Sequence, residues 1–290
     1  KIPMMVSMDA EWGLGMRFKD KGLSFPRQLM LGAVQDLTQI ELMGYAIGKQ
    51  LLALGVQVSF SPVADININP LNPVIGDRSF GEDKIQVSSH AIAYMKGLQA
   101  AGVLTSGKHF PGHGYIQADS HLQACVDDRP LDDINKIDLV PFRRMVDYGV
   151  SGIMVAHVIF SKVDQKPAGF STVWLQQVLR TELQFDGCIF TDDLSMRGAE
   201  VEYCETMLQR AQAALSAGCD MILVCNNTDG VDEVLQTLQW DMPVASRSRL
   251  ARMHAERLTG SMLKLREQKD YMQAVDEIDS MKNRNKELLF

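Results

Sequence analysis

The residue types most suited to chemistry gather in one stretch, Lys108–His121, which reads KHFPGHGYIQADSH. An apolar run over residues 102–107 leads into Lys108 and His109, and a Pro-Gly pair then opens a polar loop. A buried strand that delivers charged residues at its carboxyl end, followed by a long polar loop, is typical of a barrel active site. The stretch therefore predicts a catalytic or binding site at the end of a parallel strand.

Asp119 and His121 stand two residues apart in this loop. At that spacing the carboxylate is close enough to hydrogen-bond the imidazole, which would fix the ring tautomer and raise its pKa. An imidazole held in this way is suited to move protons near neutral pH. The pair is therefore predicted to act as a general acid/base.

Composition narrows the class of protein. The chain has 290 residues, a net charge of −7 and no long basic run, which disfavours nucleic acid and anionic membrane as partners. Five cysteines without a CxxC pattern fit a reducing compartment. We find neither a signal peptide nor an apolar run of membrane-spanning length, so the cytoplasm is the expected location.

The order of elements predicts the fold. Apolar, strand-like runs alternate with segments of helical periodicity, which favours a parallel sheet buried on both faces. The predicted strands cover residues 2–8, 56–60, 103–107, 152–157, 187–191 and 220–225. The predicted helices cover residues 31–54, 83–101, 130–148, 172–183 and 200–217, and another begins at 231.

Polar or charged residues recur at the carboxyl ends of these strands, and they are Asp9, Asp65, Lys108, His109, His157, Asp192 and Asn226. This distribution favours a TIM-type barrel over an open doubly wound sheet. The chain has no GxGxxG or Walker loop that would indicate a nucleotide fold.

The motifs also carry a family resemblance. KHFPGHG followed by Asp-Ser-His, the run 185–196 (FDGCIFTDDLSM) and the run 217–227 (AGCDMILVCNN) occur in that order. Together they resemble the bacterial β-N-acetylglucosaminidases of glycoside hydrolase family 3, the NagZ-like enzymes of peptidoglycan recycling. The resemblance extends from about Val6 to Asn227.

The resemblance implies a (β/α)8 barrel, of which this α/β chain lacks the first two βα units. We therefore expect a barrel catalytic domain over residues 1–242 and a C-terminal helical segment over residues 243–290. A barrel without two strands has two sheet edges that must be covered or charged. The C-terminal segment and partner chains are the candidates to cover them, and the sequence leaves the oligomeric state open.

The resemblance implies that Asp192 is the nucleophile of a retaining mechanism, with His121, held by Asp119, as the general acid/base. Asp193 is adjacent, but alternation along the strand points it the other way. The alternative is that the aspartate pair caps the following helix.

Five residues match positions that bind N-acetylglucosamine in the family, and they are Asp9, Arg17, Arg78, Lys108 and His109. Carboxylates and cationic donors of this kind orient sugar hydroxyls. The alternative for Arg78 is a structural ion pair with Asp77 or Glu82. Around Asp9 the chain reads DAEWG where the family commonly has DQEGG, so Trp12 changes the contacts expected at the rim. His113 and His157 are expected to be structural, and the role of Asp65 stays open between packing and support of the site.

The function implied is that of a retaining exo-β-N-acetylglucosaminidase acting on muropeptides that carry GlcNAc, without a cofactor or metal. A family 3 β-glucosidase and a phosphorolytic enzyme remain alternatives, because a histidine acid/base does not repel phosphate. A truncated barrel that binds sugar without turnover is another. The last is a metal-dependent hydrolase, whose ligands would come from His109, His113, Asp119, His121 and His157.

Overall fold

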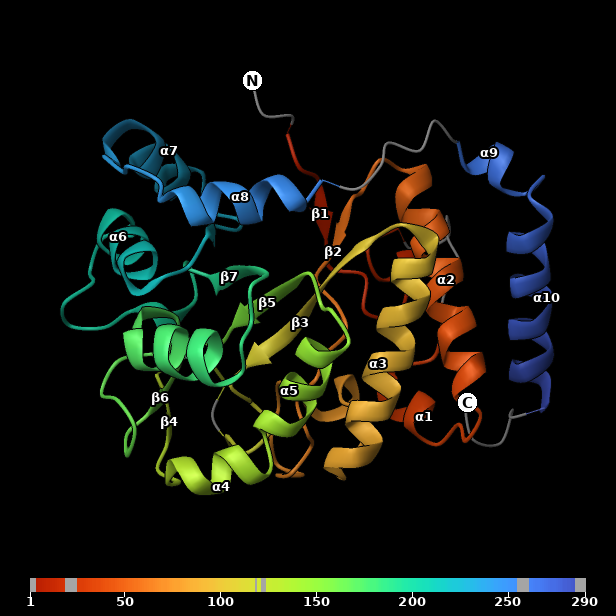
Figure 1. The fold of residues 1–290 in the computed structure, drawn as a ribbon, viewed down its shortest axis with the longest axis horizontal. Helices are drawn as coiled ribbons and strands as arrows, with labels where there is room; N and C mark the ends of the chain where they lie inside the picture. The colour runs from red at the N-terminus through yellow and green to blue at the C-terminus, as the bar shows by residue number, and fades with distance from the viewer. Residues whose placement is uncertain (1–3, 19–24, 118, 121–123, 255–260, 285–290) are drawn as a thin grey trace.

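The computed structural model describes residues 4–18, 25–117, 119–120, 124–254 and 261–284. Its central feature is a sheet of six parallel strands (Figure 1). In spatial order these are β1 Ser7–Met8, β2 Val58–Ser59, β3 Leu104–Phe110, β5 Gly152–Val155, β7 Cys188–Asp193 and β8 Met221–Leu223. Each strand overlaps one of the predicted apolar runs, so the prediction of six parallel strands is confirmed, although β3 and β7 continue two or three residues beyond the predicted ends.

The sheet is curled, and its strands follow one another in space in their order along the chain. Within the described residues β8 pairs with β7 but not with β1, so the six strands form an open arc of a barrel. A second parallel pair joins β4 Cys125–Asp127 to β6 Val158–Phe160. The strand β4 follows the loop that contains Asp119, and β6 follows β5 almost directly, so this pair lies beside the carboxyl ends of the main strands.

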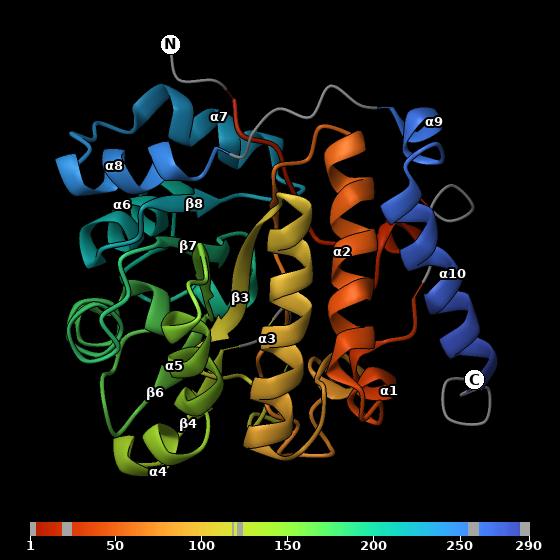
Figure 2. The same cartoon turned by 45° about the vertical axis from the view of Figure 1, so that its right-hand side comes forward.

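Helices cover the outside of the arc (Figures 1 and 2). The longer ones are α2 Leu37–Ala53, α3 Lys84–Ala101, α5 Leu139–Asp147, the π-type helix η4 Val173–Glu182, α6 Met207–Ala217, α7 Thr228–Thr237, α8 Val244–Arg252 and α10 Lys269–Arg284. The short ones are η1 Leu14–Met16, α1 Gln28–Gly32, η2 Gly76–Arg78, α4 Leu131–Lys136, η3 Ala168–Phe170, η5 Arg197–Ala199 and α9 Met262–Leu265. No helix in these described ranges combines the length and apolar character that a bilayer span requires.

Several predicted helices begin later than expected because a capping side chain lies inside the periodic run. The predicted helix 31–54 is divided into α1 and α2, and the Asp36 side chain accepts from the Thr38 amide at 3.0 Å to start α2. The predicted helix 200–217 is confirmed only from α6 onward, where Thr206 and Gln209 form a capping box. The predicted helix 130–148 is also split, into α4 and α5, but no side-chain cap begins either of them. Capping residues satisfy the free amides of a first turn, so they override apolar periodicity.

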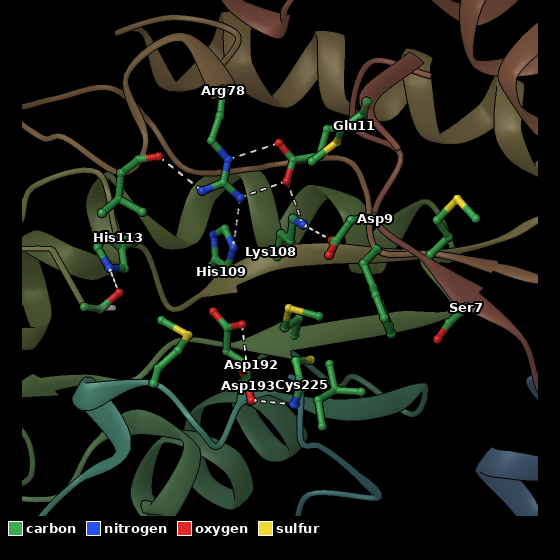
Figure 3. A pocket seen from close by; sticks show the side chains of 18 of the residues that line it. Ser7, Asp9, Glu11, Arg78, Lys108, His109, His113, Asp192, Asp193 and Cys225 are labelled. Atoms are coloured by element: carbon green, nitrogen blue, oxygen red, sulfur yellow. Dashed lines mark hydrogen bonds and ion pairs between the residues drawn. The ribbon is translucent and has the colours of Figure 1, made fainter. Parts of the chain in front are cut away.

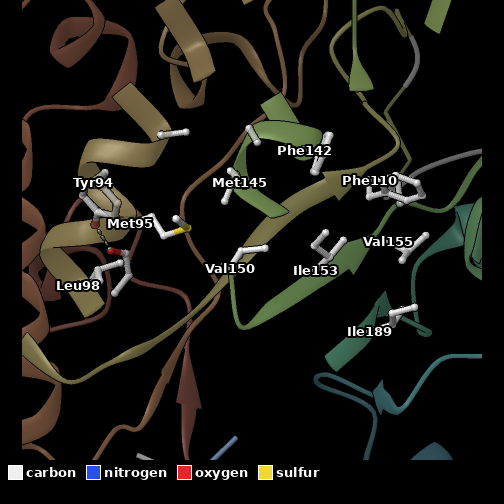
Figure 4. Close-up of a cluster of buried hydrophobic side chains, with 14 of the residues drawn as sticks. Tyr94, Met95, Leu98, Phe110, Phe142, Met145, Val150, Ile153, Val155 and Ile189 are labelled. Atoms are coloured by element: carbon white, nitrogen blue, oxygen red, sulfur yellow. Dashed lines mark hydrogen bonds between the residues drawn. The ribbon is translucent and has the colours of Figure 1, made fainter. Parts of the chain in front are cut away.

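Both faces of the sheet are apolar, as predicted. Side chains alternate along β5, where Ile153 and Val155 belong to the outer cluster that also contains Phe142 of α5 (Figure 4). The intervening Met154 faces the inside of the arc. There it joins a second cluster whose other buried members are Val58, Phe60, Cys188, Phe190 and Met253.

The C-terminal helices attach to the arc at two places. At the amino end of β7, Arg249 and Arg252 of α8 pair with Asp186. On the other side α10 lies outside α2 (Figures 1 and 2), where the Gln50 amide donates to the Tyr271 hydroxyl at 2.9 Å. The division of the chain at residue 242 stays a prediction, and the contacts describe how helices beyond that point are held.

The close packing of α2 against α3 supplies a test of the fold. A Cβ added at Gly97 would lie 1.9 Å from the Glu41 carbonyl oxygen, so Gly97→Ala must force the two helices apart. We expect the free energy of unfolding to fall by about 1–3 kcal/mol, as overpacked cores do. Urea denaturation would measure it, with Ala100→Ser, an exposed site on the same helix, as a control that changes stability by less than about 0.5 kcal/mol. Equal stability of the two variants would contradict this packing.

Candidate active site

A cavity of about 690 Å³ opens at the carboxyl ends of β1, β3, β7 and β8. This edge of a parallel barrel is where catalytic groups converge. All five predicted sugar-binding residues line the cavity together with the predicted nucleophile Asp192. The structure therefore brings together residues that are far apart in the chain, and Figure 3 shows Asp192 facing His109 and Lys108 across the space.

A buried network of charges forms one wall. The Lys108 ammonium, in a residue only 2% exposed, lies 2.7 Å from a carboxylate oxygen of Asp9 and 2.7 Å from one of Glu11. Glu11 also accepts from Arg78 Nε at 3.0 Å and Nη2 at 2.8 Å. Burial opposes ionisation of Glu11, but Lys108 and Arg78 outweigh it and hold the pKa of Glu11 well below its usual range. The carboxylate stays charged and fixes both cations.

Glu11 was not among the residues predicted from the sequence. Its signal was its place two residues after Asp9, since alternate residues of an extended segment share a face. The structure also corrects the structural alternative for Arg78, because its partner is Glu11. Asp77 pairs with Arg27 instead.

Asp9 is held between two cations. Lys108 donates to one of its oxygens, and Arg17 Nη2 donates to the other at 2.9 Å. Arg17 is about half-exposed, so this pair lies toward solvent at the rim. A carboxylate oriented in this way retains free lone pairs that can accept from sugar hydroxyls.

Asp65 supports the site by holding residues that line or adjoin the cavity. The sequence had left its role open between packing and support. Its buried carboxylate receives the backbone amides of His109 at 3.1 Å and His113 at 2.8 Å. The same group lies 2.7 Å from His109 Nδ1, so Nδ1–H donates and Nε2 is left facing Arg78. Burial raises the pKa of Asp65, but His109 and His113 lower it by more, so the carboxyl group is ionised. The Lys108–His109 peptide is cis, and both side chains line the cavity.

The two aspartates at the end of β7 have different surroundings. Asp193 accepts from the amides of Ser195 and Cys225, each at 2.9 Å, and so joins the turn after β7 to the segment after β8. The Asp192 carboxylate accepts from the Asp193 amide at 2.8 Å and is directed into the cavity (Figure 3). The capping role expected as an alternative thus falls on Asp193, at a turn.

Charge keeps Asp192 ionised. Burial raises its pKa, but the nearby His109 and His157 rings, the Asp193 amide and the Lys108 ammonium lower it by more. An ionised carboxylate in a cavity lined by cations is suited to attack an electrophilic carbon. His157 is buried, which lowers its pKa, and it does not line the cavity within the described chain.

The predicted acid/base pair is only partly described. Asp119 is half-buried, Ser120 lines the cavity, and His121 lies outside the described residues. Among the residues that are described, no group of three or more His, Cys, Asp or Glu side chains is arranged to hold a metal ion.

Comparison with known proteins now adds to this geometry. The sequence profile of the glycosyl hydrolase family 3 N terminal domain matches residues 1–253. The chain belongs to this family. It is therefore a glycoside hydrolase with the α/β, TIM-type fold that its sequence predicted.

Known relatives align with this chain over most of their own length. A protein named beta-hexosaminidase from Nitrosomonas eutropha is 45% identical over 282 residues, which cover 95% of this chain and 80% of the relative. Native NagZ from Neisseria gonorrhoeae superposes with a TM-score of 0.84 at 35% identity, over 94% of this chain and 79% of that one. The same protein in complex with N-trifluoroacetyl-D-glucosamine gives a TM-score of 0.82 at 33% identity, over 94% and 80%.

The buried network predicts that removing the charge of Glu11 strongly lowers the stability of the fold. Glu11→Gln keeps the shape of the side chain but leaves two buried cations with one carboxylate fewer, so we expect a loss of about 3 kcal/mol in unfolding free energy. Denaturant melts of the variant and of the exposed control Glu82→Gln would measure it, and the control should change by less than about 0.5 kcal/mol. Indistinguishable melts would mean that the network does not stabilise the fold.

Asp65 predicts a pH dependence of stability. Its pKa is lower in the folded protein than the ordinary value, so its contribution is complete above that value and is lost as the pH falls through the folded pKa. The unfolding free energy of the wild type should therefore fall as the pH goes from about 5 to about 3, and less steeply in Asp65→Asn. Parallel curves for the two proteins would refute the assignment.

Proposed function

We propose that this protein is a retaining exo-β-N-acetylglucosaminidase that removes terminal GlcNAc from peptidoglycan-derived muropeptides. The observation that carries the proposal is an ionised Asp192 facing a fixed set of charged sugar-binding groups across one cavity. The relative from Nitrosomonas eutropha is named a beta-hexosaminidase, and the gonococcal NagZ binds an N-acylated glucosamine. These names support a β-linked N-acetylhexosamine as the substrate class.

In the proposed reaction, the carboxylates of Asp9 and Glu11 and the donors Lys108, Arg78 and Arg17 surround the terminal sugar. Asp9 accepts from hydroxyl groups, while the cations and His109 Nε2 set the orientation of the ring. Because these groups are held by ion pairs before substrate arrives, little ordering is left for the binding step. The anomeric carbon is then presented to Asp192.

The first chemical step forms a bond between a carboxylate oxygen of Asp192 and the anomeric carbon. The bond from that carbon to the leaving oxygen breaks, and His121 supplies the proton that the leaving oxygen takes up. In the second step His121 accepts a proton from water, whose oxygen displaces Asp192 and releases GlcNAc with retained configuration. Asp119 is proposed to orient the imidazole, and the scheme uses no metal or cofactor.

We further propose that the protein acts in peptidoglycan recycling in the cytoplasm. The proposed substrate class and the five cysteines without a CxxC pattern support this location. The acceptor in the second step is the point at which phosphorolysis differs from hydrolysis, since phosphate would take the place of water.

The nucleophile gives the direct test. Asp192→Asn should lower kcat/KM for 4-nitrophenyl β-N-acetylglucosaminide at least about 10³-fold, because an amide cannot form the glycosyl ester. The matched control is Asp193→Asn, whose amide oxygen can still accept from Ser195 and Cys225, and it should retain activity within about tenfold. Equal losses in both variants would contradict the assignment of Asp192.

The same assay separates the alternatives. Turnover of the β-glucoside in preference to the N-acetyl substrate would indicate a β-glucosidase, and sugar phosphate formed in phosphate buffer would indicate phosphorolysis. Loss of activity with a chelator would indicate a metal-dependent hydrolase. Sugar binding by folded protein without turnover would show an inactive barrel.

A further inference from the structure

We propose that Ser120 is a positioning residue, which fixes the backbone between Asp119 and His121 by bonds to the segments after β3 and β7. This inference rests on the proposed function, because it concerns the acid/base chemistry of that same site. Ser120 is 2% exposed and lines the cavity, although a serine in a polar loop carries no signal of its own in the sequence.

The first contact comes from the segment after β3. Ser120 Oγ lies 2.8 Å from His113 Nε2, and both side chains are buried. The backbone amide of His113 donates to one oxygen of Asp65 at 2.8 Å, while the other oxygen of Asp65 holds His109. One carboxylate therefore locates a sugar-binding histidine and, through His113, the hydroxyl of Ser120.

The second contact comes from the segment that follows the nucleophile. The Gly198 amide in η5 donates to the Ser120 carbonyl oxygen at 2.8 Å. A Cβ added at Gly198 would lie 3.0 Å from that oxygen and 2.8 Å from the His157 carbonyl oxygen. Only a residue without a side chain fits this close approach. The backbone of the segment after Asp192 therefore directly contacts the backbone of the loop at Ser120.

These two contacts hold Ser120 through both its side chain and its backbone. Consecutive Cα atoms are about 3.8 Å apart across a trans peptide, so fixing Ser120 restricts the backbone from which Asp119 and His121 extend. A displacement of about 1 Å in a catalytic group can cost about 100-fold in rate. Ser120 thus acts on proton transfer through its neighbours, and its own hydroxyl is engaged by His113.

A positioning role in proton transfer has a signature that a general loss of stability or affinity lacks. An aryl glycoside of an acidic phenol, such as 2,4-dinitrophenol, departs without protonation, whereas the phenyl glycoside needs the general acid. The second step needs a base when water attacks, but azide attacks the glycosyl-enzyme without one. Ser120→Ala should therefore slow cleavage of the phenyl glycoside more than that of the dinitrophenyl glycoside, and attack by water more than attack by azide.

The experiment compares kcat/KM for phenyl and 2,4-dinitrophenyl β-N-acetylglucosaminide in wild type and Ser120→Ala. We expect the variant to lose at least about tenfold more on the phenyl substrate, within the range that acid–base catalysis contributes. We also expect azide to raise kcat of the variant on the dinitrophenyl substrate and to leave that of the wild type nearly unchanged. Equal losses on the two substrates, or no loss, would overturn the proposal.

Two further variants sharpen the result. Ser106→Ala removes a buried serine hydroxyl of β3 that has no hydrogen-bond partner in the described chain, and it should match the wild type on both substrates. Gly198→Ala disturbs Ser120 from the opposite side and should show the same leaving-group dependence as Ser120→Ala. An equal loss on both substrates in Gly198→Ala with folding intact would also count against the proposal.

The outcome also separates this inference from the proposed function. A wild-type protein that hydrolyses neither substrate would refute the proposed activity and, with it, the role of Ser120. A wild type that hydrolyses both, beside a Ser120→Ala variant that loses activity equally on both, would leave the function standing and refute the role of Ser120 alone.

Discussion

A buried ammonium group governs the arrangement of this site. Lys108 lies at the carboxyl end of β3 almost without exposure to solvent, and a charge in that position is stable only when it is paired. Its partners Asp9 and Glu11 come from the segment after β1, which β2 separates from β3 in the sheet. Glu11 then reaches Arg78 in η2. The need to neutralise one cation thus connects the segments that form a wall of the cavity.

A second buried carboxylate organises the adjoining part of the site, where His109 lies 3.5 Å from Arg78. Asp65 follows β2 and receives bonds from His109 and His113, which lie on either side of the Pro-Gly break after β3. Because the His113 ring also hydrogen-bonds the Ser120 hydroxyl, Asp65 helps to position the loop that contains Asp119. Glu11 and Asp65 thereby hold the groups that are proposed to bind the substrate and to protonate its leaving oxygen.

Packing on both faces of the sheet explains how the site can form on an open arc of strands. Apolar side chains fill both faces, so the strands are stabilised by packing as well as by their hydrogen bonds. Helix α8 is attached at the amino end of β7 and Met253 after it enters the inner cluster, whereas α10 packs outside α2. The polar groups gather at the carboxyl ends, where Phe60 and Met154 of the inner cluster also line the cavity. The packing inside the arc therefore directly supports the site.

The sequence by itself determined the parallel strands, their buried character and the edge at which the site lies. Apolar runs alternating with helical periodicity are local patterns, and polar residues at strand ends mark one edge because parallel strands share a direction. Asp9, Lys108, His109 and Asp192 stand at such strand ends. The family resemblance implied their roles and added Arg17 and Arg78, and all six residues line one cavity. The boundaries of α2 and α6 were missed because single capping side chains decided them.

Only the tertiary structure decided which charges pair and which residues support others. Glu11 and Arg78 are 67 positions apart, and their contact depends on strand order and register that no local pattern encodes. The same is true of Gly198 and Ser120, whose backbones meet because the loops after β3 and β7 converge. Asp193 was distinguished from Asp192 by the amide of Cys225, in the segment after the neighbouring strand β8. Periodicity specifies the face on which a side chain lies, whereas its partner is specified by the folding of the whole sheet.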